Sequence, residues 1–148
     1  RSSRIQCSSS LETNKTLRIV LVDDILVNRK IMKRFIDGLR VEVGVDNYMI
    51  VEASNGKEAI EKFKEANGNF QLVFMDCLMP ILDGFKSTVA IQYECECLGI
   101  EPVIVVGVTA GISPSVTEKC IESGMKLVIE KPYSKKDLLL SLRIAMGV

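Results

Sequence analysis

Apolar runs of strand length alternate with segments of helical periodicity along most of this chain. Such alternation is typical of a parallel sheet whose two faces are both covered by helices. The sequence therefore predicts an α/β fold of five strand and helix pairs. The strand-like runs lie near residues 17–22, 48–53, 71–75, 103–108 and 127–130.

The helical segments carry apolar stripes and recognisable start signals. Capping residues and turns open four of them; the signals are Asn55, Asp83-Gly84, Ser113-Pro114 and Ser134. The stripe of the first predicted helix consists of Ile31, Met32, Phe35, Ile36 and Leu39, and the third predicted helix rests on Phe85 and Val89. Residues 39–48 leave three interpretations open: an extension of the first helix, a short strand or a long loop.

Polar side chains close four of the five apolar runs. Asp23 and Asp24 follow the first run, Asp76 the third, Thr109 the fourth and Lys131 the fifth. All strands of a parallel α/β sheet have their carboxyl ends at one edge, where such folds place their sites. We therefore expect these five side chains to converge, although the sequence separates them widely.

The residue types in this cluster suit phosphoryl chemistry. Magnesium prefers oxygen ligands, which Asp23, Asp24 and Asp76 supply, and three crowded carboxylates are unfavourable without a cation. Asp76 can attack phosphorus to form an acyl phosphate while the Lys131 ammonium stabilises the phosphoryl oxygens. Thr109 adds a hydroxyl donor. The sequence predicts a Mg²⁺-dependent phosphoacceptor, with Mn²⁺ able to substitute.

Composition excludes several other classes of protein. The 19 basic and 19 acidic residues cancel without forming a basic stripe, so nucleic-acid binding is not expected. No apolar run approaches the roughly 20 residues that span a bilayer, so we expect no membrane contact and a cytoplasmic location. Five cysteines without a CxxC pair and without any histidine argue against zinc. We expect reduced thiols, with Cys77 and Cys120 packed in apolar space.

Four sequence phrases resemble the receiver domain of two-component response regulators, over about residues 17–147. They are Val22-Asp23-Asp24, Met75-Asp76-Cys77-Leu78-Met79-Pro80 with Asp83-Gly84, Val108-Thr109-Ala110 and Glu130-Lys131-Pro132. The resemblance implies a flavodoxin-like (CheY-like) doubly wound fold, with five parallel strands in the order 2-1-3-4-5 and five helices.

The same resemblance implies a role for each matched residue. Asp76 would be the phosphoacceptor, Thr109 the switch hydroxyl and Lys131 the phosphate-binding cation. Asp24, Asp76 and the carbonyl of Leu78 would bind the metal directly, and Asp23 would act mainly through metal-bound water. The phosphoryl donor would be a phosphohistidine on a histidine kinase or a histidine phosphotransfer protein. Phosphorylation would change the surface of the fourth helix and fifth strand.

Two positions depart from the family pattern. The usual aromatic switch residue, three positions before the lysine, is Val128 here, and Tyr133 is a candidate for a related purpose. Leu78 and Gly111 stand where polar groups often control how water reaches the phosphoryl group. We therefore expect a comparatively long-lived acyl phosphate.

The organisation of the chain follows from these assignments. Residues 1–16 are polar and aperiodic, which predicts a linker or disordered arm, and residues 17–148 form the receiver domain. Because the chain begins with Arg1, we expect a piece of a longer protein, and the wording around Asp76 resembles receivers fused to hybrid histidine kinases. The oligomeric state is left open.

Two alternatives belong to other functional classes. One is a magnesium-dependent phosphatase-type enzyme that works through an aspartyl phosphate. Asp23-Asp24-Ile25 lacks the DxD nucleophile motif of such enzymes. The other is a pseudo-receiver that serves only as an interaction module. The receiver itself would catalyse no more than its own phosphorylation and dephosphorylation.

Overall fold

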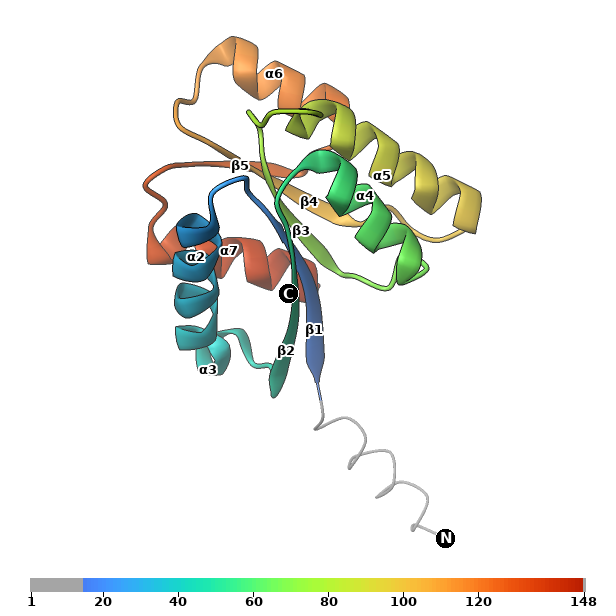
Figure 1. Ribbon diagram of the computed structural model, residues 1–148. Coiled ribbons are helices and arrows are strands. Elements are labelled where there is room, and N and C mark those ends of the chain that lie inside the picture. Colours follow the sequence, from blue (N-terminus) through green and yellow to red (C-terminus); the bar gives the residue numbers. More distant parts are fainter. Residues whose placement is uncertain (1–14, 148) are drawn as a thin grey trace, which may run out of the picture.

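The computed structural model of the chain describes residues 15–147, where five strands alternate with six helices (Figure 1). The strands are β1 (Thr16–Val22), β2 (Asn47–Ala53), β3 (Leu72–Asp76), β4 (Ile104–Thr109) and β5 (Leu127–Glu130). The helices are α2 (Leu26–Gly38), α3 (Arg40–Val43), α4 (Gly56–Glu65), α5 (Gly84–Leu98), α6 (Pro114–Ser123) and α7 (Lys135–Met146). The bounds of every predicted strand are correct to within one residue.

The five strands form one parallel sheet in the order β2-β1-β3-β4-β5. This is the predicted order. β3 lies at the centre, paired with β1 on one side and β4 on the other, and all five of its residues are buried. The central strand therefore carries its last residue, Asp76, to the middle of the carboxyl edge.

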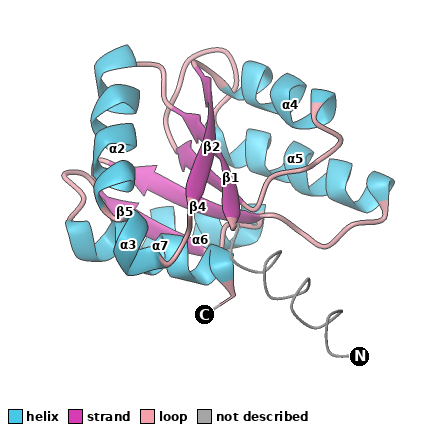
Figure 2. Cartoon of the chain, turned by 90° about the horizontal axis from the view of Figure 1, so that it is seen from below, coloured by secondary structure: helices cyan, strands magenta, loops and turns pink. Residues whose placement is uncertain are grey.

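Helices cover both faces of the sheet (Figures 1 and 2). Successive strand residues point to opposite faces, and β1 shows this: Ile19 and Leu21 pack in the core under α2, α3 and α7, whereas Val20 and Val22 pack in the core under α4, α5 and α6. The chain thus has two apolar layers separated by one sheet.

The segment between α2 and β2 resolves the three interpretations of residues 39–48. It forms the separate one-turn helix α3, which ends at Val43 and is capped by Gly44 in the left-handed conformation with φ 83°. Val43 and Val45 are buried. Of the three interpretations, the helical one is correct in part, because the segment is helical but does not extend α2. With α3, the described residues contain six helices and not the predicted five.

Two predicted helix faces were wrong in part. Ile31 and Phe35 of α2 are largely exposed, and the buried side chains of that helix are Met32 and Ile36. In α5, Val89 is exposed. The inward positions of α5 instead include polar residues, which a hydrophobic pattern does not select.

Thr88 shows how such a polar residue is tolerated on the inner face of α5. Its hydroxyl donates to the carbonyl of Gly84 at 2.7 Å, one helical turn earlier. Because the hydrogen bond is satisfied locally, the hydroxyl can be buried at little cost.

The predicted helix starts are confirmed by side-chain hydrogen bonds. Asn55, Asp83 and Ser113 each accept a hydrogen bond from a main-chain N–H in the first turn of the following helix. Ser134 and Asp137 form a reciprocal capping box at the start of α7. Each cap fixes where a loop at the carboxyl edge of the sheet ends.

None of the helices in residues 15–147 combines the length and apolar character that a bilayer crossing requires. The linker predicted for residues 1–16 falls, for residues 1–14, outside the described part of the chain. The assignment of that arm therefore stays a prediction.

Candidate phosphoryl site at the carboxyl edge of the sheet

Four adjacent strands deliver the predicted polar residues to one edge. Asp23 and Asp24 follow β1, Asp76 ends β3, Thr109 ends β4 and Lys131 follows β5. These strands are neighbours in the order β1-β3-β4-β5. The convergence expected from the sequence is therefore present in the fold.

Three carboxylates form the acidic part of the site. One oxygen each from Asp23, Asp24 and Asp76 lie within 4.8 Å of one another. Asp76 is buried, Asp23 is partly buried and Asp24 is exposed. A set of three carboxylate oxygens open to solvent on one side suits a hard divalent cation that keeps several waters, so these residues fit Mg²⁺.

Lys131 provides the positive charge of the site. Its Nζ lies 3.4 Å from Oδ2 of Asp23 and 3.5 Å from Oδ2 of Asp76. The main-chain N–H of Lys131 donates to the carbonyl of Thr109 at 2.7 Å. This bond ties the loop after β5 to the end of β4, and the Lys131-Pro132 peptide bond in that loop is cis.

The pKa of the Asp76 carboxyl is higher than that of an ordinary aspartate. Its pKa is raised from 3.8 to about 6, mainly because the group is buried. The positive charge of Lys131 and the main-chain N–H of Leu78 lower the pKa, and the negative charge of Asp23 raises it, within that net shift. At pH 7 a carboxyl with this pKa is still mostly ionised. The raised pKa means that the folded protein holds this negative charge at a cost, which a bound cation would offset.

Asp23 is held by groups that sequence reasoning missed. Its Oδ1 accepts a hydrogen bond from the N–H of Ile25 at 2.9 Å, and the amide of Asn28 lies 3.3 Å and 3.4 Å from its two carboxylate oxygens. Arg29 donates to its carbonyl at 2.7 Å. The position of Asn28 and Arg29 in the first turns after the acidic pair is the one signal that could have identified them.

Thr109 is buried at the end of β4. Its hydroxyl interacts at 3.3 Å with the N–H and the carbonyl of Gly111 in its own loop. Leu78, two residues after Asp76, has a 71% exposed side chain. The assignment of the Leu78 carbonyl as a metal ligand stays a prediction.

Val128 and Tyr133 lie on opposite faces of the sheet. Val128 packs against the core under α4, α5 and α6, whereas Tyr133 packs against the core under α2, α3 and α7. The ring of Tyr133 meets the ring of Phe35 edge to face, with centroids 6.1 Å apart. Tyr133 therefore contacts the α2 side of the molecule and does not fill the space beside Val128.

Cys77 and Cys120 are buried as expected, with their Sγ atoms 3.8 Å apart. The described cysteines Cys77, Cys95, Cys97 and Cys120 are free thiols. Cys7 lies outside the described residues.

Comparison with known proteins gives a consistent picture. The family model described as the response regulator receiver domain matches residues 19–143. The chain is 31% identical over 151 residues to hybrid signal transduction histidine kinase B of Dictyostelium discoideum, covering 96% of this chain and 7% of that protein. It is 35% identical over 131 residues to the osmosensing histidine protein kinase SLN1 of Saccharomyces cerevisiae, covering 86% of this chain and 10% of the kinase.

A solved structure extends the likeness to three dimensions. The co-crystal structure of the Saccharomyces cerevisiae histidine phosphotransfer signaling protein Ypd1 and the receiver domain of its downstream response regulator Ssk1 matches with a TM-score of 0.72 and 26% sequence identity. The match covers 84% of this chain and 85% of that chain. The chain spans only a small fraction of the kinases to which it is similar. With the family model matched over most of its length, the chain belongs to the response regulator receiver domains of phosphorelay systems.

Proposed function

We propose that Asp76 accepts a phosphoryl group from a phosphohistidine. The observation that carries this proposal is the buried carboxylate of Asp76 at the carboxyl edge, with the Lys131 ammonium 3.5 Å away and two further carboxylates beside it. A buried, ionised carboxylate in that setting is a nucleophile with a ready-made partner for the incoming negative charge.

Phosphoryl transfer to Asp76 forms one bond to phosphorus and breaks another. An oxygen of Asp76 forms a bond to phosphorus while the P–N bond of the phosphohistidine breaks, and the electron pair of that bond stays on the imidazole nitrogen. The product is an acyl phosphate on Asp76. The leaving group is a neutral imidazole when the other ring nitrogen of the phosphohistidine already carries a proton; otherwise the released nitrogen takes a proton from solvent to give the neutral imidazole. Lys131 stabilises the phosphoryl oxygens, and rotation about the Thr109 side chain lets its hydroxyl donate to one of them.

The carboxylates of Asp23, Asp24 and Asp76, together with the carbonyl of Leu78, are the proposed ligands of Mg²⁺, for which Mn²⁺ can substitute. A bound divalent cation supplies charge that stabilises the phosphoryl oxygens and relieves repulsion among the acids. Asp23 is already oriented by Ile25 and Asn28, so the site is organised before the ion arrives.

The phosphoryl donor is a histidine kinase or a histidine phosphotransfer protein, docked over exposed apolar side chains near the acids. These side chains belong to the loop after β1, the first turn of α2 and the loop after β3, and they are Ile25, Leu26, Val27, Leu78 and Ile81. Exposed apolar side chains on the loops beside a charged site are typical of a protein-binding surface. The yeast receiver Ssk1 was crystallised with its phosphotransfer protein, which supports this class of partner.

Docking and chemistry can be separated by one substitution. Val27→Glu places a charge among the exposed apolar side chains but leaves the acids and Lys131 unchanged. Transfer from a phosphorylated phosphotransfer protein should fall about ten-fold or more, as for a hot-spot residue, whereas labelling by a small phosphodonor should stay the same. An equal loss in both assays would contradict the docking surface. Since the kinases that start such a relay use ATP, we place the domain in the cytoplasm.

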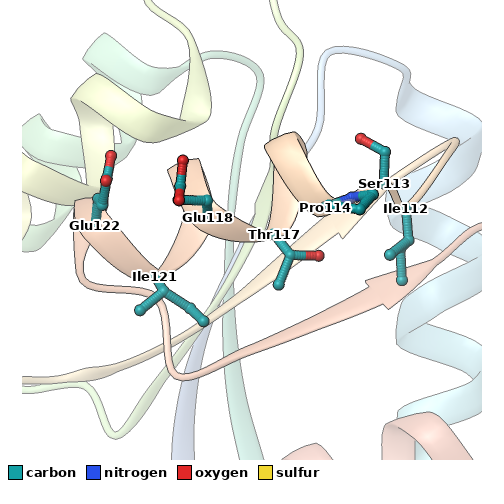
Figure 3. Close-up of a pocket in the computed structure, with 7 residues that line it drawn as sticks. All are labelled: Ile112, Ser113, Pro114, Thr117, Glu118, Ile121 and Glu122. Carbon is teal, nitrogen blue, oxygen red and sulfur yellow. The ribbon is translucent and has the colours of Figure 1, made fainter.

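The surface that changes on phosphorylation is formed by α6 and β5. Thr109 ends β4 directly before the loop to α6, so a movement of its hydroxyl reaches that helix through few residues. Along α6 lies a cavity of about 610 Å³ lined by Ile112, Ser113, Pro114, Thr117, Glu118, Ile121 and Glu122. Figure 3 shows Ile112, Thr117 and Ile121 on one side of the helix. This cavity offers a partner both apolar and acidic contacts.

The proposal is tested by labelling the protein with phosphoramidate and Mg²⁺, followed by intact-mass measurement and peptide mapping. One phosphoryl group should appear, on the peptide that contains Asp76. Asp76→Asn should abolish labelling, whereas the matched Asp37→Asn, which alters an exposed carboxylate of α2, should label like the wild type. Normal labelling of Asp76→Asn would overturn the assignment.

A turnover assay and the labelling experiment together distinguish the alternatives. Steady turnover of small phosphate esters would favour a phosphatase-type enzyme. A folded protein that shows no magnesium-dependent labelling would favour a pseudo-receiver. The complete set of Asp23, Asp24, Asp76 and Lys131 in one place argues for a working receiver.

A further inference from the structure

Arg29 of α2 is placed between two oxygen acceptors on different elements. Its Nη1 donates to the main-chain carbonyl of Asp23 at 2.7 Å, and its Nε donates to Oε1 of Glu52 at 2.9 Å. The arginine side chain is 13% exposed. The other carboxylate oxygen of Glu52 pairs with Lys33 at 3.3 Å, and that lysine is much more exposed.

The bond to the carbonyl matters because Asp23 also presents a carboxylate. A guanidinium binds a carboxylate in preference to a carbonyl, since two parallel hydrogen bonds between opposite charges are stronger than one hydrogen bond to an uncharged acceptor. The carbonyl and the carboxylate belong to one residue, so rotations within the arginine side chain would bring the guanidinium from one to the other. The carboxylates of Asp23 and Asp76 already face the ammonium of Lys131. A second cation there would occupy the oxygens that a metal ion needs.

We propose that Glu52 is a positioning residue that holds the guanidinium of Arg29 on the main chain of Asp23 and thereby keeps it off the metal-binding carboxylates. Glu52 lies in β2, opposite Leu21 of β1, and among the described residues its carboxylate bonds to Arg29 and Lys33. It acts through Arg29 alone. The inference rests on the proposed function, because it concerns the magnesium site of that function.

Mg²⁺ affinity of charge-matched variants, measured by calorimetry, tests this role. Glu52→Gln releases Arg29 and should weaken Mg²⁺ binding about ten-fold, the size of effect seen for residues that support metal ligands indirectly. Removing one further cation then restores the original net charge in two ways. Arg29→Gln with Glu52→Gln removes the competing guanidinium, and most of the affinity should return. Lys33→Gln with Glu52→Gln leaves Arg29 free, and the affinity should stay low.

The two double variants separate positioning from a simple field effect. If Glu52 acted only as a remote negative charge, removal of either cation would compensate for its loss, and the Lys33→Gln double variant would also recover affinity. Equal recovery, or wild-type affinity in Glu52→Gln alone, would overturn the inference. Magnesium binding without labelling of Asp76 would contradict the proposed function and not the role of Glu52.

A measurement on the unmodified protein gives a second test that does not depend on the folding of any variant. The Nε–H of Arg29 should give a slowly exchanging nuclear magnetic resonance signal, because it is bonded to Glu52 and largely buried. Addition of Mg²⁺ should leave its chemical shift nearly unchanged. A large shift, or rapid exchange before Mg²⁺ is added, would show that Glu52 does not hold the guanidinium and would overturn the inference.

Discussion

The main chain of Gly84 lies directly against the main chain of Asp76. A Cβ at Gly84 would come within 2.2 Å of the Asp76 carbonyl oxygen and 2.9 Å of Cα of Cys77. The N–H of Gly84 donates to the carbonyl of Cys77 at 3.0 Å. The start of α5 therefore packs on the residue that the proposed function phosphorylates, and only a residue without a side chain fits there.

Gly84→Ala should destabilise the protein and displace Asp76. Both obstructing groups are main-chain atoms, so relief requires backbone movement, and we expect a loss of about 3 kcal/mol in the free energy of unfolding. Urea unfolding followed by circular dichroism measures it. The control is Gly38→Ala, where a Cβ would meet nothing within 4 Å and alanine favours the helix, so stability should be unchanged or slightly higher. Equal stabilities of the two variants would contradict this packing.

The raised pKa of Asp76 predicts how stability depends on pH when no metal is present. A carboxyl whose pKa rises from 3.8 to about 6 on folding contributes stability that is present below the unfolded pKa and lost as the pH rises through the folded pKa. Asp76→Asn mimics the neutral form, so at pH 7 in EDTA it should be more stable than the wild type by about 1–2 kcal/mol.

The difference between the Asp76→Asn and wild-type proteins should disappear at about pH 4 and below. Adding Mg²⁺ at pH 7 should stabilise the wild type much more than the variant. Thermal unfolding in EDTA over this pH range provides the measurement. A wild type that is the more stable of the two at pH 7 without metal would show that burial does not disfavour the charge of Asp76.

The lifetime of the acyl phosphate should depend on Leu78. Its apolar, exposed side chain belongs to the second residue after the proposed phosphoacceptor Asp76, and an apolar group cannot orient an attacking water. Leu78→Asn introduces a polar group that can, at a position where substitution should not disturb the core, and we expect hydrolysis to become several-fold faster. Loss of label over time, followed by intact mass, measures the rate. An unchanged or slower rate would remove the basis for expecting a long-lived phosphoryl group.

Lys131→Ala should separate phosphorylation from the surface response. The ammonium bridges Asp23 and Asp76 here, and the proposed acyl phosphate would use it to link the phosphoryl oxygens to the loop after β5. Labelling by phosphoramidate should become slower, yet labelled protein should show no shift of the amide resonances of α6. Wild-type shifts in the labelled variant would mean that the switch works without this residue.

The cysteines should differ sharply in reactivity. Cys97 is exposed, whereas Cys77, Cys95 and Cys120 are buried, and burial raises the pKa of the Cys77 and Cys120 thiols. In a protein with Cys7 replaced by serine, one thiol should react quickly with a disulfide reagent, and the other three only after unfolding. Rapid reaction of all four thiols in the native protein would contradict the burial of this core.

The sequence predicted the carboxyl edge well because its signals are geometrical. In a parallel sheet, a polar residue at the end of a buried apolar run must lie at the carboxyl edge. Asp76, Thr109 and Lys131 all lie there. The pairing of Arg29 with Glu52 could not be predicted, since a contact between α2 and β2 follows no sequence periodicity. The prediction that Val89 lies on the inward face of α5 was wrong. Thr88 is buried there instead, because its hydroxyl donates a hydrogen bond to the carbonyl of Gly84 within the same helix.

The burial of all five β3 residues between two layers of helices limits local unfolding at the end of this strand. Because β3 also pairs with a strand on each side, its tip cannot fray independently in the way that the end of an outer strand can. Exchange of the Met75 amide hydrogen should therefore require opening of the whole domain. The carboxylate of Asp76 should therefore keep its position at the carboxyl edge until the domain unfolds as a whole.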